Sequence, residues 1–93
     1  MSRVRTFQLE GSPDDLYFAN FARVDEEVIF SEVYDILKDN HVDIGPKHIG
    51  PSEDFYHCNL DGKKFILFYD IDDGAFIHAT DESVMNKIKQ LFD

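Results

Sequence analysis

The chain is poor in several residue types. It has one cysteine, Cys58, no tryptophan, three prolines and five glycines among 93 residues. A lone cysteine excludes an internal disulfide and a cysteine cluster for metal, and it fits a reducing compartment. No run approaches the ~18–20 apolar residues of a membrane span. No apolar stretch follows Arg3 and Arg5, as it would in a signal peptide. We therefore expect a cytoplasmic protein that makes no membrane contact.

Basic residues are also scarce. Nine Lys and Arg face 19 Asp and Glu, and the net charge of −10 exceeds the magnitude of about 2–8 that is usual for a small domain. Most of the excess lies in residues 10–43, where ten acids oppose two bases. Such a field repels nucleic-acid phosphates and attracts basic proteins. We expect a basic protein partner and no direct nucleic-acid binding, with an ordinary solvated surface as the alternative.

The chain nevertheless has enough apolar residues for a core. Hydrophobic residues make up 43% of it, including nine Phe and four Tyr. A disordered chain would have few aromatics. The length fits one domain, which we place at residues 1–93.

The first half of the chain contains one clear element. Side chains in residues 3–10 alternate between two faces, as in an edge strand. Residues 16–24 fit either a strand or a short helix, and their aromatic content favours the strand. Residues 25–40 are typical of a helix, with Asp25 as the N-cap and an apolar stripe at helical spacing. Two Ile-Gly-Pro segments punctuate residues 41–52, so we predict a loop there, long enough to be functional.

The second half predicts three strands and a helix. Strands are expected at 55–60, 63–70 and 75–80, joined by turns at Asp61-Gly62 and Asp72-Asp73-Gly74. The middle strand is apolar on both faces and is therefore predicted to be central. Thr80 or Asp81 caps the last helix. The fold class is α+β: an antiparallel sheet of four to five strands with two helices packed on it.

No pattern in the chain matches a catalytic, cofactor or metal motif. His57 and Cys58 are neighbours on a strand and point to opposite faces, so they cannot pair as base and nucleophile. Asp70–Gly74 resembles a calcium loop, but its glycine comes one residue early. His41, Asp43 and His48 share one segment without a diagnostic spacing. We predict a protein that is not an enzyme and has no cofactor or metal.

An acidic protein that binds a basic one suits an inhibitor of a nuclease, whose own substrate groove is positive. In size, acidity, α+β build and lack of motifs, the chain resembles immunity proteins of bacterial contact-dependent growth inhibition systems. That resemblance implies a small cytoplasmic inhibitor of a toxic nuclease domain. It transfers no site residue by residue.

The contact surface is therefore predicted from this chain alone. Candidates are the acids on the exposed side of the 25–40 helix, those of the 70–73 turn and the segment around His48, with Tyr56 or Tyr17 as an aromatic anchor. The predicted partner-binding residues are Glu32, Asp35, Asp39, His48, Glu53, Asp54, Tyr56, Asp70, Asp72 and Asp73.

Two other hypotheses are kept. The first is a small ligand-binding or enzymatic domain acting around His57, Cys58 and His78, which would need a pocket lined by these residues. The second is a structural homodimer that pairs through an edge strand such as residues 3–10. The sequence does not decide the oligomeric state.

Overall fold

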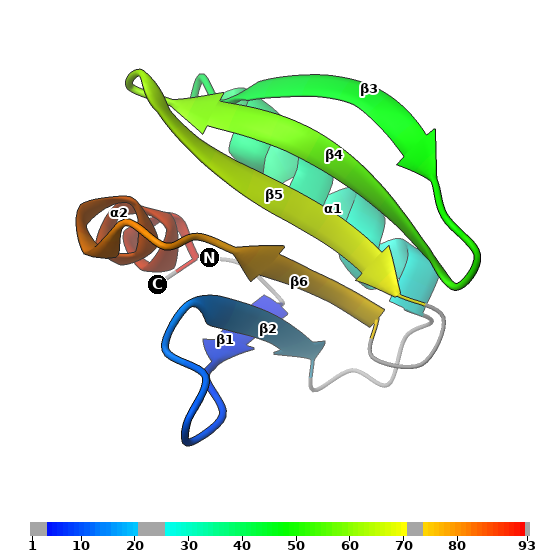
Figure 1. Ribbon diagram of the computed structural model, residues 1–93, viewed down its shortest axis with the longest axis horizontal. Coiled ribbons are helices and arrows are strands. Elements are labelled where there is room, and N and C mark those ends of the chain that lie inside the picture. Colours follow the sequence, from blue (N-terminus) through cyan, green and yellow to red (C-terminus); the bar gives the residue numbers. More distant parts are fainter. Residues whose placement is uncertain (1–3, 21–25, 71–73, 93) are drawn as a thin grey trace.

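The computed structural model describes residues 4–20, 26–70 and 74–92 and forms an α+β fold. Six strands make one antiparallel sheet in the order β1-β2-β6-β5-β4-β3. Figure 1 shows α1 behind β4 and β5, and α2 beside the end of β6. The elements are β1 Val4–Phe7, β2 Asp15–Asn20, α1 Glu26–Asp39, β3 Asp43–Ile49, β4 Glu53–Leu60, β5 Lys63–Asp70, β6 Gly74–His78 and α2 Glu82–Leu91.

The predicted strand count is wrong by one, because β3 occupies the segment expected to be a loop. β3 is an edge strand, where a proline costs no internal ladder bond. Pro46 lies inside the register shift between Ile44 and Lys47, which is where a bulge tolerates it. Gly45 is needed for close approach, since a Cβ there would come 2.9 Å from the His57 carbonyl oxygen. The glycines and prolines therefore shape an irregular strand.

The ambiguous segment after the first turn is a strand, as favoured. β2 pairs with β1 and with β6, and residues 21–24 lie outside the described part of the chain. The middle strand of the second half, β5, is one of the two central strands, as predicted. Asp61 and Gly62, with φ values of 54° and 84°, make the tight β4–β5 turn.

The core lies between the sheet and the two helices. Alternate residues of the central strands, such as Leu67 and Ile77, are fully buried on this side. Val33 and Leu37 bring the predicted stripe of α1 into the same core. Phe92, just after α2, packs on Phe18 of β2 with ring centroids 4.8 Å apart. Both helices therefore cover one face of the sheet and leave the other without a helix.

Asp81 begins α2, as one of the two predicted caps. Its carboxylate accepts hydrogen bonds from the backbone N–H groups of Ser83 and Val84. Bonds from the Ser83 hydroxyl and from the Val84 N–H hold the pKa of Asp81 at about 2. The cap satisfies amide groups that a helix N-terminus otherwise leaves unpaired.

We expect Asp81→Ala to lower the melting temperature at neutral pH. Because the pKa is lowered in the folded state, the contribution of Asp81 is complete above about pH 4 and is lost as the pH falls towards 2. The gap between wild type and Asp81→Ala should therefore close over that range. Asp81→Asn, which can also cap, should recover part of the stability at neutral pH without this pH dependence. A gap that stays constant down to pH 2 would show that the carboxylate does not act as a charged cap.

Candidate binding surfaces

The helix-free face of the sheet carries a row of aromatic rings, one from each strand. In the antiparallel ladder Phe7 is the register partner of Tyr17, Tyr17 of Phe76, Phe76 of Phe68, Phe68 of Phe55 and Phe55 of His48. The rings therefore stand side by side across the whole sheet. We call this set the aromatic row: Phe7, Tyr17, Phe76, Phe68, Phe55 and His48.

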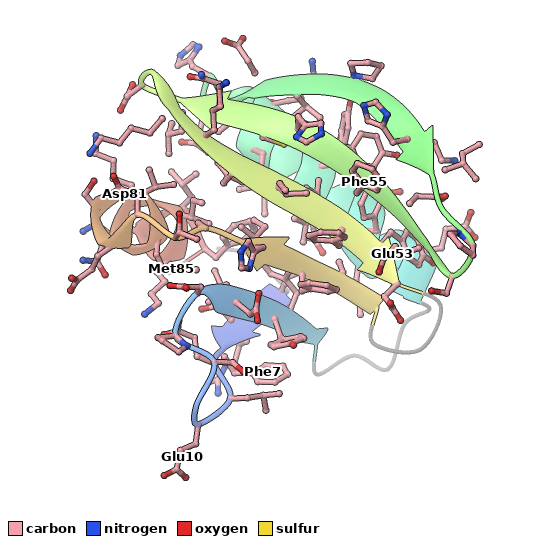
Figure 2. The ribbon with its side chains drawn as sticks, in the orientation of Figure 1. Phe7, Glu10, Glu53, Phe55, Asp81 and Met85 are labelled. Carbon is pink, nitrogen blue, oxygen red and sulfur yellow. The ribbon has the colours of Figure 1, made fainter. Side chains whose placement is uncertain are left out.

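The rings of the aromatic row contact one another along its length. Phe68 and Phe76 stack at its centre, with centroids 4.7 Å apart and planes 10° apart. The neighbouring contacts have centroid distances of 5.3 to 6.0 Å, and His48 stacks on Phe55 at 4.9 Å. Phe7, at one end, is 44% exposed. Figure 2 labels Phe7 and Phe55, which lie towards opposite edges of the sheet. No helix of the described chain covers these rings.

A polar row runs beside the aromatic row on the same face. His78 of β6 is the register partner of Asp15 on β2 and of Ile66 on β5. Ile66 is in turn the register partner of His57 on β4. The Nδ1 atom of His78 is 2.7 Å from a carboxylate oxygen of Asp15. A shallow hollow of about 250 Å³ lies between the two histidines. It is lined by His57, Lys64, Phe65, Ile66, His78 and Thr80.

Three predicted acids lie at the end of the sheet where α1 begins (Figure 1), Glu53 and Asp70 on the helix-free face and Asp54 on the helix side. Glu53 of β4 is the register partner of Asp70 of β5, and Asp54 follows Glu53 along β4. Asp54 pairs with Lys47 of β3 at 3.5 Å. We call Glu53, Asp54 and Asp70 the acidic end. Asp72 and Asp73, predicted for the same surface, lie outside the described residues.

The predicted acids of α1 form a second surface, on the side of the helix turned away from the core. Asp35 and Asp39 are exposed and Glu32 is half-buried. Lys38 lies between them in sequence, and its ammonium is 5.9 Å from the centre of the Tyr34 ring. The α1 surface thus presents carboxylates to solvent with one neighbouring cation.

The two predicted aromatic anchors lie on opposite faces of the sheet. Tyr56 is half-buried on the helix side, with its ring centre 5.6 Å from that of Phe30 and 6.1 Å from that of Tyr34. Burial is the main cause that raises the pKa of Tyr56. Tyr17 belongs to the aromatic row, as does the predicted contact residue His48.

His57 and Cys58 point to opposite faces, as the sequence predicts. Cys58 is buried on the helix side, where its thiol donates to the carbonyl of Tyr56 at 3.5 Å. Burial raises the pKa of Cys58 to about 11, so the sulfur is a thiol at neutral pH. His57 and His78 share the hollow on the other face. In the described part of the chain, no three His, Cys, Asp or Glu side chains come together as metal ligands.

The sequence predictions did not include the aromatic row. A signal was present: Phe7, Tyr17, Phe55, Phe68 and Phe76 occupy the alternate strand positions that a one-sided sheet gives to polar residues. The sequence pattern predicts an apolar second face for residues 63–70 alone. The register that joins the rings is a long-range property, which no single strand reveals.

Comparisons with known proteins add no relative to this picture. No family model, no curated protein and no solved structure matches the chain. In the described residues, no helix is both long and apolar enough to cross a membrane.

Proposed function

We propose that the protein is an acidic inhibitor that binds and occludes a basic protein, of the kind represented by immunity proteins of bacterial toxin systems, with a nuclease domain as the partner. The observation that supports this proposal is the acidic end. Two strands bring Glu53 and Asp70 directly opposite each other. The two carboxylates stand side by side at one end of the sheet, where cationic side chains of a basic protein can meet them.

The acids of α1 extend the same chemistry. Asp35 and Asp39 are exposed on α1, on the opposite side of the sheet from Glu53 and Asp70. Charge of one sign on both sides of the molecule raises the association rate with a basic protein. The net charge of −10 adds to this steering at long range. The proposed partner surface is the positive groove in which a nuclease holds its phosphates.

The proposal is tested with a purified bacterial nuclease toxin domain, taken from a neighbouring gene where such a gene encodes one. Mixed with the chain on a gel-filtration column, it should elute as a complex. The association rate should fall steeply as salt rises from about 0.05 to 0.5 M, because screening shortens the reach of the acids. If the two proteins elute separately at low salt, the proposed partner class is wrong.

An enzymatic function around His57, Cys58 and His78 receives less support. The hollow joins the two histidines but not Cys58, which lies on the other face of the sheet. All of its polar lining groups except His78 belong to exposed residues. We therefore keep the inhibitor as the single proposed function.

A further inference from the structure

The helix-free face carries charged side chains and histidines beside its rings. Strand alternation places four acids on it, together with Arg5 and Lys64. This ratio of acids to bases is close to that of the whole chain, which has 19 acids and nine bases. Three of the four histidines, His48, His57 and His78, also lie on this face. The acids of the helix-free face are Asp15, Asp43, Glu53 and Asp70.

The arrangement of the rings selects among possible occupants. Because Phe68 and Phe76 stack on each other at 4.7 Å, their faces are covered and their edges point outwards. Covered faces cannot accept stacked bases, which is how single-stranded nucleic acid is held. The acids beside the row also repel phosphates. Outward ring edges favour another apolar surface, of the kind found where two sheets pack face to face.

We propose that the aromatic row is the interface of a homodimer in which the sheets of two copies pack face to face. With the two-fold axis parallel to the strands, β6 of one copy lies over β5 of the other, and β2 over β4. Phe76 then meets Phe68 of the second copy at the centre of the interface. Asp15 meets His57 of the second copy at the flank, so an acid faces an imidazole. Each contact between the two copies therefore occurs twice with the roles of the copies exchanged, as a two-fold interface requires.

The size of the face is sufficient for a reversible dimer. Six strands spaced by about 4.8 Å and three ranks of side chains give a face on the order of 600 Å² per copy. That value is at the low end of the range for specific interfaces, which bury about 800 Å² per partner. We expect a dissociation constant in the micromolar range, on the order of 1–100 μM. The dimer leaves the helix side, with the acids of α1, on its two outer surfaces.

The test is sedimentation of the full chain from about 1 to 500 μM, concentrations that bracket this range. The average mass in solution should rise with concentration, from the 10.8 kDa of one chain towards twice that value. Phe76→Glu should weaken association by about 100-fold, since it places a charge at the centre of the interface. The matched control is Val28→Glu, on α1, where Val28 is 41% exposed. It should dimerise like the wild type.

A second measurement uses the wild type alone, so its outcome does not depend on whether Phe76→Glu folds. In the wild type, the ring proton resonances of Tyr17, Phe68 and Phe76 should shift with concentration while those of Tyr34, on α1, stay constant. A mass of 10.8 kDa at the highest concentration would overturn the proposal. So would a dimer that survives Phe76→Glu in a folded protein, or binding of an oligothymidine that removes the concentration dependence. Glu53 and Asp70 lie at one end of the same face, so the dimer and the capture of a basic protein compete for these two residues. A failure to dimerise leaves the capture of a basic protein in place, and a failure of capture leaves the dimer in place.

Discussion

Leu67→Ala is expected to destabilise the fold by about 2–5 kcal/mol, enough to remove a large part of the stability of a small domain. Leu67 is on a central strand and has no exposed surface, and its side chain lies in the core between the sheet and the helices. Truncation removes buried methyl groups and leaves a cavity that the rigid sheet cannot fill. Urea unfolding at micromolar protein concentration measures the change.

The neighbouring residue on the same strand gives the control. Ile66 points to the helix-free face and is half-buried, so Ile66→Ala should cost about 1 kcal/mol, well below Leu67→Ala. Both variants lose apolar groups from β5. They differ mainly in the face of the sheet from which those groups are lost. Equal losses for the two would contradict the assignment of the core to the helix side.

The second large effect concerns association with a basic partner. Glu53→Gln combined with Asp70→Asn should slow association by about 10-fold at low salt, and the effect should shrink as the Debye length falls to about 3 Å in 1 M salt. The reason is that the two carboxylates are register partners at the end of the sheet. Stopped-flow or surface-binding kinetics with the nuclease domain measures the rate.

A control variant separates a local effect from net charge. Glu10→Gln combined with Asp43→Asn removes the same two charges from exposed positions away from the acidic end. Glu10 lies in the β1–β2 turn, as Figure 2 shows, and Asp43 begins β3. The control should slow association far less. Equal slowing by both variants would mean that the acidic end has no special part in steering.

The elements that local patterns define were the ones predicted correctly. α1 and α2 follow from apolar stripes at helical spacing, and Val33, Leu37, Val84 and Ile88 of those stripes are buried. β4, β5 and the turn at Asp61-Gly62 follow from alternation and turn chemistry. In each case the signal is contained within about ten residues.

The errors and omissions depend on contacts between distant segments. The sequence predicts a loop where β3 lies because Gly and Pro weaken a strand, but an edge position with a bulge accepts Pro46. The acidic end joins Glu53 to Asp70, and the aromatic row joins Phe7 to His48, only through the register of the sheet. Sequence reasoning identified Glu53, Asp54 and Asp70 as candidates, but not which of them adjoin.

The most direct measurement of the central claim is a titration of nuclease activity. Increasing amounts of the chain are added to a fixed amount of the nuclease toxin domain, and cleavage of a nucleic-acid substrate is followed. The proposed function predicts that activity falls to zero near one chain per toxin domain, and that Glu53→Gln with Asp70→Asn requires more protein. Full nuclease activity in a large excess of the folded wild-type chain would contradict it.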